Sequence, residues 1–266
     1  MIKPRSLRWA MLLLWSLPCW AVGAQSLTVV TEASPFTERL GADQEGAEAT
    51  AFVEMLIAQA GLSADFRFLP WRRAYRLAQL ERDTLIYPIA RTPQRETRFH
   101  WIGRLIPVRY YLFKLRARKD IQLSTLQDAA VYRIGVVNAH VHHEYLQRQG
   151  FSRLQSVNDN AQNVHKALLG RIDLFPLSDG GLLPVCEREK VDCSLFEPLL
   201  ELTDISGGLY LAANPDIAPD TLQRLRESYQ TLTDKGLRDT VFARRLRIIQ
   251  DFYRQWPVIG TVKTAD

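Results

Sequence analysis

The sequence has 266 residues, enough for one large domain or two small ones, and contains 34 basic residues, 29 acidic residues and three cysteines. Without the first 24 residues the basic residues number 31, and the net charge falls from +5 to +2. A nearly neutral chain argues against nucleic-acid binding as the main function. Beyond those residues, no stretch approaches the ~18 consecutive apolar residues that a membrane-spanning helix needs.

The N-terminus has the three-part pattern of a secretory signal peptide. Basic residues precede a short apolar run at 9–17, and the small residues at 22–24 suit a cleavage site. The apolar run is too short to span a bilayer comfortably, and Pro18 before Cys19 argues against lipidation. We therefore expect residues 1–24 to be removed and the product to be exported to the periplasm.

Two cysteines, Cys186 and Cys193, remain in the exported chain, seven residues apart. In an oxidising compartment an even pair at this spacing favours a disulfide that closes a small loop. Two free buried thiols are the alternative. The spacing does not fit a zinc site, which would need further ligands nearby.

Short β-prone runs alternate with helical patterns directly after the signal segment. Gly61 suits the end of the first helix, and Pro70 suits the start of the second. The predicted strands are 27–31, 65–69 and 85–90, and the predicted helices are 48–60 and 72–81. The order β-α-β-α-β implies a parallel sheet with right-handed crossovers.

A second α/β unit follows the extended stretch 110–116. Its predicted strands are 132–137, 154–157 and 172–177, and its predicted helices are 142–149 and 161–169. Another predicted strand at 208–213 and two predicted helices at 220–235 and 237–245 follow. We expect the last two helices to return to the first unit, because no third sheet remains for them to cover.

The two units predict two lobes, with residues 25–115 and 205–266 in the first and 116–204 in the second. Two extended crossovers, near 114–119 and 202–208, would join the lobes. Ligands usually bind in the crevice between such α/β units, at the carboxyl ends of the strands. We therefore expect a ligand cleft between the lobes.

Four segments together resemble the periplasmic solute-binding proteins of the amino-acid type (family 3). That family follows its third strand with Ser/Thr, any residue, Thr, two residues and Arg, and residues 90–95 (ARTPQR) supply the Thr and the Arg. Residues 133–140, 170–179 and 233–245 are similar to the strands of the family's second lobe and to its C-terminal helices. The resemblance covers nearly all of residues 27–246 and implies an α/β fold, the type II two-lobe periplasmic binding protein.

By this resemblance, Arg95 binds a carboxylate of the ligand. A guanidinium group suits that role because it is a rigid fork that grips a carboxylate with two hydrogen bonds and stays charged. The resemblance also places Thr92, Trp71, Arg72 and Glu32 around the ligand. The alternatives are a surface arginine for Arg95, a core tryptophan for Trp71 and a solvated loop residue for Glu32.

The second lobe departs from the family's pattern. The family's aspartate for the ligand's ammonium group falls here on Ser178, with Asp179 one residue later. His140 lies where the family usually offers hydrogen-bond donors at a helix N-terminus. We expect Ser178 and His140 to line the cleft, and the ligand to be small, polar, amino-acid-like and carboxylate-bearing, with an altered ammonium contact.

The resemblance implies capture of the ligand by hinge closure, for an ABC transporter. The alternative is a sensor subunit that presents the ligand to a membrane signalling receptor. An enzyme of peptidoglycan metabolism is disfavoured, because the sequence has no nucleophile elbow and no paired catalytic carboxylates. The segment 140–144 (HVHHE) lacks the His-Glu-x-x-His zinc pattern, so no metal or cofactor is expected. The expected partners are the ligand and either an ABC permease or a membrane sensor, without nucleic acid, and the chain is expected to be a monomer.

Overall fold

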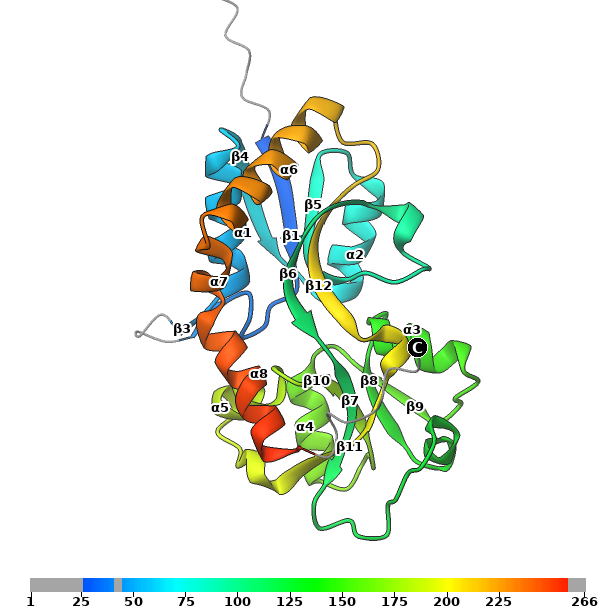
Figure 1. Ribbon diagram of the computed structural model, residues 1–266. Coiled ribbons are helices and arrows are strands. Elements are labelled where there is room, and N and C mark those ends of the chain that lie inside the picture. The colour runs from blue at the N-terminus through cyan, green and yellow to red at the C-terminus, as the bar shows by residue number, and fades with distance from the viewer. Residues whose placement is uncertain (1–25, 41–44, 258–266) are drawn as a thin grey trace, which may run out of the picture.

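Each of the two lobes is built on its own β-sheet, as the computed structural model shows (Figure 1). The structure describes residues 26–40 and 45–257, so the predicted signal peptide lies outside the described residues. Within those two ranges, none of the helices combines the length and apolar character needed to cross a membrane.

The first lobe contains a five-stranded sheet in the order β4-β1-β5-β12-β6. Strand β1 runs parallel to β4 and β5, whereas β12 runs antiparallel to β5 and β6. The elements of this lobe are β1 (Ser26–Thr31), β2 (Arg39–Leu40), β3 (Glu45–Gly46), α1 (Glu48–Gln59), β4 (Ser63–Phe68), α2 (Trp71–Leu80), β5 (Thr84–Ala90), η1 (Glu96–Arg98), β6 (His100–Val108), β12 (Gly207–Ala213), α6 (Pro219–Asp234) and α7 (Leu237–Val241).

Helices cover both faces of this sheet, which explains the continuous apolar sequence of β5. Neighbouring strand residues point to opposite faces. Leu85 packs with side chains of α1 and α6, and Ile86 packs with those of α2. Strand β5 therefore carries the chain through the core of the lobe and delivers the residues after Ala90 to the side that faces the second lobe (Figure 1).

The second lobe contains the three-stranded sheet β10-β7-β11 and the parallel pair β8-β9, which an Ile134–Leu174 bridge connects to the segment before β10. Its elements are β7 (Tyr110–Leu115), η2 (Leu126–Val131), β8 (Ile134–Val137), α3 (Val141–Arg148), β9 (Leu154–Val157), α4 (Asn160–Leu168), β10 (Phe175–Ser178), α5 (Leu182–Glu189), η3 (Cys193–Leu195), β11 (Phe196–Glu201) and η4 (Thr203–Ile205).

The chain crosses between the lobes at Arg109 and again at residues 202–206. Strand β7 pairs with β10 and β11, so it belongs to the second lobe. The predicted lobe boundary at residue 115 and the predicted crossover at 114–119 are therefore wrong by one strand. Strands β6 and β7 form one nearly continuous extended run, and its local pattern does not reveal which sheet each half joins.

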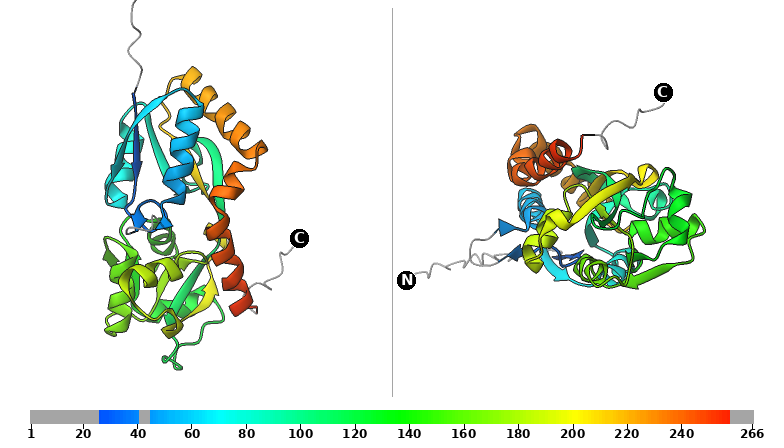
Figure 2. Two further views of the ribbon diagram at one scale, coloured as in Figure 1. Left: turned by 90° about the vertical axis from the view of Figure 1, so that its left-hand side faces the viewer. Right: turned by 90° about the horizontal axis from the view of Figure 1, so that it is seen from below.

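Helix α8 (Ala243–Gln255) does not stay with the first lobe as expected. It runs alongside the second lobe (Figures 1 and 2), where the Phe252 ring lies 5.3 Å from the Tyr111 ring. A Cβ atom on Gly180 would lie 2.9 Å from Ile249, so the helix packs closely on the turn after β10. The amphipathic pattern of α8 predicts a covered face without saying which lobe covers it.

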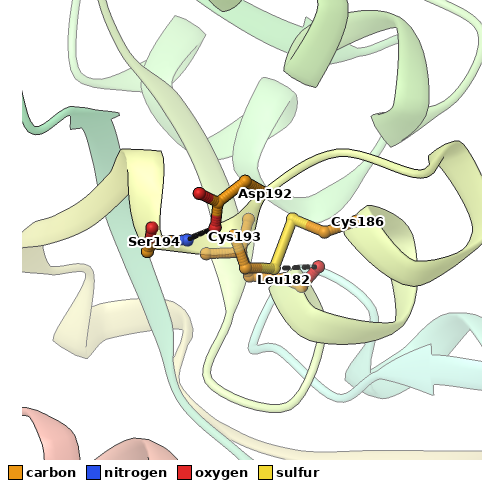
Figure 3. The surroundings of a disulfide bond; sticks show 5 residues. All are labelled: Leu182, Cys186, Asp192, Cys193 and Ser194. Atoms are coloured by element: carbon orange, nitrogen blue, oxygen red, sulfur yellow. Dashed lines mark hydrogen bonds between the residues drawn. A yellow bond between two sulfur atoms is a disulfide. The ribbon is translucent and has the colours of Figure 1, made fainter.

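A disulfide joins Cys186 of α5 to Cys193 of η3, with their Cα atoms 5.6 Å apart (Figure 3). Cys186 is buried in the apolar core that α4 and α5 form with β7, β10 and β11. The bond ties the end of α5 to the start of β11, on the side of the second lobe that carries α8.

Candidate functional site

A cavity lies between the two lobes and is lined from both. The first lobe contributes residues that follow β1, start α2 or end β5, and the second lobe contributes the starts of α3 and α4 and the turn after β10. The lining includes the predicted site residues Glu32, Trp71, Arg95, His140 and Ser178. The crevice thus lies at the carboxyl ends of strands from both sheets, where ligands of α/β proteins usually bind.

Arg95 lies at the edge of this cavity and is only 1% exposed. Its backbone N–H bonds to the carbonyl of Thr92 at 2.9 Å, which closes the turn that aims the side chain inward. The guanidinium group packs against the rings of Trp71 and Tyr75, and its Nη2 donates to Glu144 Oε2 at 2.9 Å. Glu144 belongs to α3, so a carboxylate of the chain's own second lobe already binds Arg95.

Trp71 begins α2 directly after Pro70, and its side chain is buried. The indole N–H donates to the carbonyl of Ala139 in the second lobe at 2.8 Å. Trp71 therefore lines the cavity and also contacts the opposite lobe. Arg72, the next residue, is exposed and lines a separate outer groove, and Thr92 is buried outside the cavity lining.

Glu32 follows β1 and faces His140, with 3.7 Å between Oε2 and Nε2. Burial raises the pKa of Glu32 to about 8, and the nearby Asp159 carboxylate acts in the same direction. Burial lowers the pKa of His140 to about 3, helped by the positive charge of Arg95. At neutral pH the cavity wall therefore holds a mostly protonated carboxyl group next to a neutral imidazole.

His140 also contacts His142, and their ring nitrogens Nδ1 and Nε2 lie 3.1 Å apart. His142 is 1% exposed, and burial lowers its pKa well below the usual value. The Tyr110 ring packs edge-on against it at 5.1 Å. Both imidazoles are thus neutral hydrogen-bonding groups of the cavity wall.

The turn after β10 places Ser178 and Asp179 together in the cavity lining. Asp179 accepts hydrogen bonds from the Tyr253 hydroxyl at 2.7 Å and from the Gly180 backbone N–H at 2.9 Å. Burial nevertheless raises the pKa of Asp179 to about 6. Arg245 of α8 completes this side, because its Nη1 donates to the Gly180 carbonyl at 2.7 Å.

Sequence patterns missed several residues of the site. His142, Asn160 and Arg245 line the cavity, and Glu144 binds Arg95. Asp179 was noted only as one position away from the family's aspartate. The HVHHE segment includes His142 and Glu144, but its pattern did not indicate their roles. No local signal indicated Arg245, because its position depends on where α8 packs.

Five buried polar atoms among the cavity-lining residues have no hydrogen-bond partner within the described part of the chain. They are Glu32 Oε1, Arg95 Nε, His142 Nδ1, Asn160 Oδ1 and Arg245 Nε. Leaving a buried polar group unsatisfied costs about 1–3 kcal/mol. Such atoms also occur outside the cavity, on Glu48, Asp83, Asn163 and Thr233, so the grouping of these five around one cavity is what matters. They come from both lobes, which is the arrangement expected of a cleft that closes on a polar molecule.

The sequence matches no protein-family model and no curated protein. Solved structures match it over most of their length. A histidine kinase sensor domain with similarity to periplasmic binding proteins is 15% identical, with a TM-score of 0.73 over 84% of this chain and 96% of its own. An ancestral arginine-binding protein bound to arginine is 13% identical, with a TM-score of 0.70 over 82% and 97% of the two chains.

The arginine-, lysine-, histidine-binding protein ArtJ from Geobacillus stearothermophilus is 12% identical, with a TM-score of 0.69 over 83% of this chain and 94% of its own. At these identities the likeness establishes the fold and leaves the ligand open. The chain therefore has the two-lobe α/β fold of periplasmic binding proteins, as its sequence predicted.

Proposed function

We propose that this chain captures a small polar, amino-acid-like solute between its two lobes. The observation that supports the proposal is the interlobe cavity with its five unpartnered buried polar atoms. A bound molecule that satisfied these atoms would remove their cost and stabilise the closed form. We propose binding rather than catalysis as the task of the site.

Closure is proposed to be a hinge motion about Arg109 and residues 202–206, the two crossovers. Glu32, Trp71 and Arg95 belong to the first lobe and His140 and Ser178 to the second, so only the closed form brings all of them to one ligand. A ligand shifts the equilibrium toward closure by the difference between its affinities for the two forms.

We further propose that the exported protein works in the periplasm with a membrane partner that recognises the closed form. An ABC permease is the first candidate, since several similar structures are amino-acid-binding proteins, including the substrate-binding protein of an amino acid ABC transporter. A membrane sensor is the second candidate, supported by the likeness to a histidine kinase sensor domain. Ligand-dependent uptake would separate the first from ligand-dependent signalling by the second.

The test is a thermal-shift screen of residues 25–266 against amino acids, small carboxylates, polyamines and peptidoglycan fragments, followed by X-ray scattering. A true ligand raises the melting temperature and lowers the radius of gyration. Two asparagines provide matched variants, because Asn160 lines the cavity and Asn158 lines the outer groove. Asn160→Ala should reduce the thermal shift and Asn158→Ala should leave it unchanged. If no compound shifts the melting temperature, solute capture is wrong.

A further inference from the structure

The charged groups that line the cavity differ in whether they have a partner of opposite charge. Two carboxyl side chains, Glu32 and Asp179, and two guanidinium groups, Arg95 and Arg245, lie among the lining residues. Equal numbers would suggest a neutral site. The contacts of the guanidinium groups with carboxylates differ from the contacts of the two carboxyl groups.

Both guanidinium groups already have a carboxylate partner that lies outside the cavity lining. Arg95 donates to Glu144 at 2.9 Å, and Arg245 lies 3.5 Å from Glu48 Oε2. Each therefore has a carboxylate beside it, and Glu48 also lies 3.9 Å from Arg244. An additional carboxylate from a ligand would meet a guanidinium group whose charge is already matched, in an enclosed space where electrostatic interactions are strong.

Within the described residues, neither carboxyl group forms an ion pair with a lysine or an arginine, although the charge of Arg188 acts on Glu32 and that of Arg109 on Asp179. The basic group nearest to Glu32 is His140, which is neutral because its pKa is far below 7. Asp179 receives hydrogen bonds only from neutral donors, the Tyr253 hydroxyl and the Gly180 N–H. Glu32 Oε1 has no partner at all, and neither has Asn160 Oδ1. Arg95 Nε and Arg245 Nε, by contrast, are unpartnered donors, but each guanidinium group already has a carboxylate beside it. The charge that is left without an ion pair is therefore that of the two carboxyl groups.

We infer that the cavity selects its ligand by a positive charge: the solute carries a protonated amine or a guanidinium group that Glu32 and Asp179 bind, and its recognition does not depend on a carboxylate. This inference rests on the proposed function and specifies the ligand class. Glu144 then has a definite role as a specificity-determining residue. It occupies Arg95 from the second lobe and so replaces the ligand carboxylate that the sequence resemblance led us to expect.

The experiment compares molecules that differ only in charged groups, by calorimetric titration of residues 25–266. Cadaverine is lysine without its carboxylate, agmatine is arginine without its carboxylate, and glutarate is a five-carbon dianion. We expect cadaverine or agmatine to bind within about tenfold of the parent amino acid, a difference of ~1.4 kcal/mol or less, and glutarate not to bind.

Three variants test the residues. Glu32→Gln should weaken agmatine or cadaverine binding by about tenfold or more, because a buried cation loses its counterion. Glu54→Gln, on the exposed side of α1, is the matched control and should change nothing. Glu144→Gln should change the affinity for these amines by no more than about threefold. It should raise the affinity for the parent amino acid, relative to that for its decarboxylated form, by about tenfold. Circular dichroism melts confirm that each variant is folded, and Asp179→Asn gives a second test of the cation site.

The outcomes separate this inference from the proposed function. Selection by positive charge is wrong, and solute capture stands, if glutarate binds and the amines do not. The same holds if removal of the carboxylate from arginine and lysine lowers the affinity by more than about 100-fold. If none of these molecules binds and the wider screen also finds no ligand, both are wrong. An unchanged preference in Glu144→Gln would remove the role assigned to Glu144.

Discussion

The indole N–H of Trp71 donates a hydrogen bond to the carbonyl of Ala139 at 2.8 Å and so connects the two lobes. The ring of the same tryptophan lines the cavity, and His140 packs against it at 5.2 Å. One side chain thus contributes to lobe closure and to the cavity wall. Arg95 and Glu144 form another direct link between the lobes.

Trp71→Phe removes this donor and keeps an aromatic ring. Because one hydrogen bond contributes about 0.5–1.5 kcal/mol, we expect the closed-to-open ratio of the empty protein to fall by about two- to tenfold. X-ray scattering should then give a larger radius of gyration without ligand. Trp101→Phe is the control, since the Trp101 indole also donates to a carbonyl, that of Glu96, but within the first lobe. An equal effect in both variants would contradict the prediction.

Glu32→Gln should change how stability depends on pH. Glu32 is protonated in the folded protein up to a pKa of about 8, while its ordinary pKa is 4.5. Between these values only the unfolded chain loses the proton, so Glu32 makes the wild type lose stability relative to the glutamine variant as pH rises, by at most about 1.4 kcal/mol per unit. The loss should stop above pH 8, and glutamine should abolish it.

Chemical denaturation of both proteins between pH 6.5 and 8.5 measures this difference. His140 and His142 also contribute at the low end of this window, because their ordinary pKa of 6.5 applies in the unfolded chain while burial lowers it in the folded protein. Both proteins contain these histidines, so their contribution cancels in the difference. A constant difference in unfolding free energy between wild type and variant would show that Glu32 is ionised in the empty protein.

Replacing both Cys186 and Cys193 by serine removes the only disulfide among the described residues. The bridge closes a loop with a sequence separation of 7, for which chain entropy predicts a loss of about 2–3 kcal/mol in unfolding free energy. The bond lies in the second lobe on the side of α8, so the melting temperature should fall while the affinity for ligand stays the same. Calorimetry of the oxidised, reduced and doubly substituted proteins checks this, and identical melting temperatures would refute it.

The sequence predicted the features of the fold that depend on local patterns. The strands and helices up to α2 have apolar spacing and terminal Gly or Pro signals, and the structure has them within a few residues. The patterns missed β6, α5 and β11. They also assigned β7 to the wrong lobe, since a strand's sheet is decided by pairing partners far away in sequence.

For the cavity, the sequence also indicated residues near local patterns and missed contacts between distant parts of the chain. The family resemblance placed Trp71, Arg95 and Glu32 around the ligand, and all three line the cavity. The Arg95–Glu144 pair joins residues 49 positions apart, and its formation depends on how the lobes face each other. Arg245 reaches the site only because α8 packs across the second lobe. Such contacts are products of tertiary packing and leave no local trace.

Binding of a cation should release a proton. With a pKa of about 8, Glu32 is about 90% protonated in the empty protein at pH 7. A positive charge beside its Oε1 atom favours the ionised form and lowers the pKa. If the bound pKa falls below about 6, ligand binding at pH 7 releases about 0.8 proton per site.

Calorimetric titration of agmatine or cadaverine in buffers with different ionisation enthalpies measures this number directly, as the slope of observed enthalpy against buffer enthalpy. The release should fall to about 0.2 proton at pH 8.5, where most Glu32 is already ionised and the ligand amine is still mostly protonated, and it should be nearly absent at pH 7 in Glu32→Gln. A variant that still binds weakly and releases no proton would identify Glu32 as the group that titrates. Equal proton release in both proteins would refute this role of Glu32. Asp179 could not account for a release of about 0.8 proton, because with a pKa of about 6 it is only about 10% protonated at pH 7.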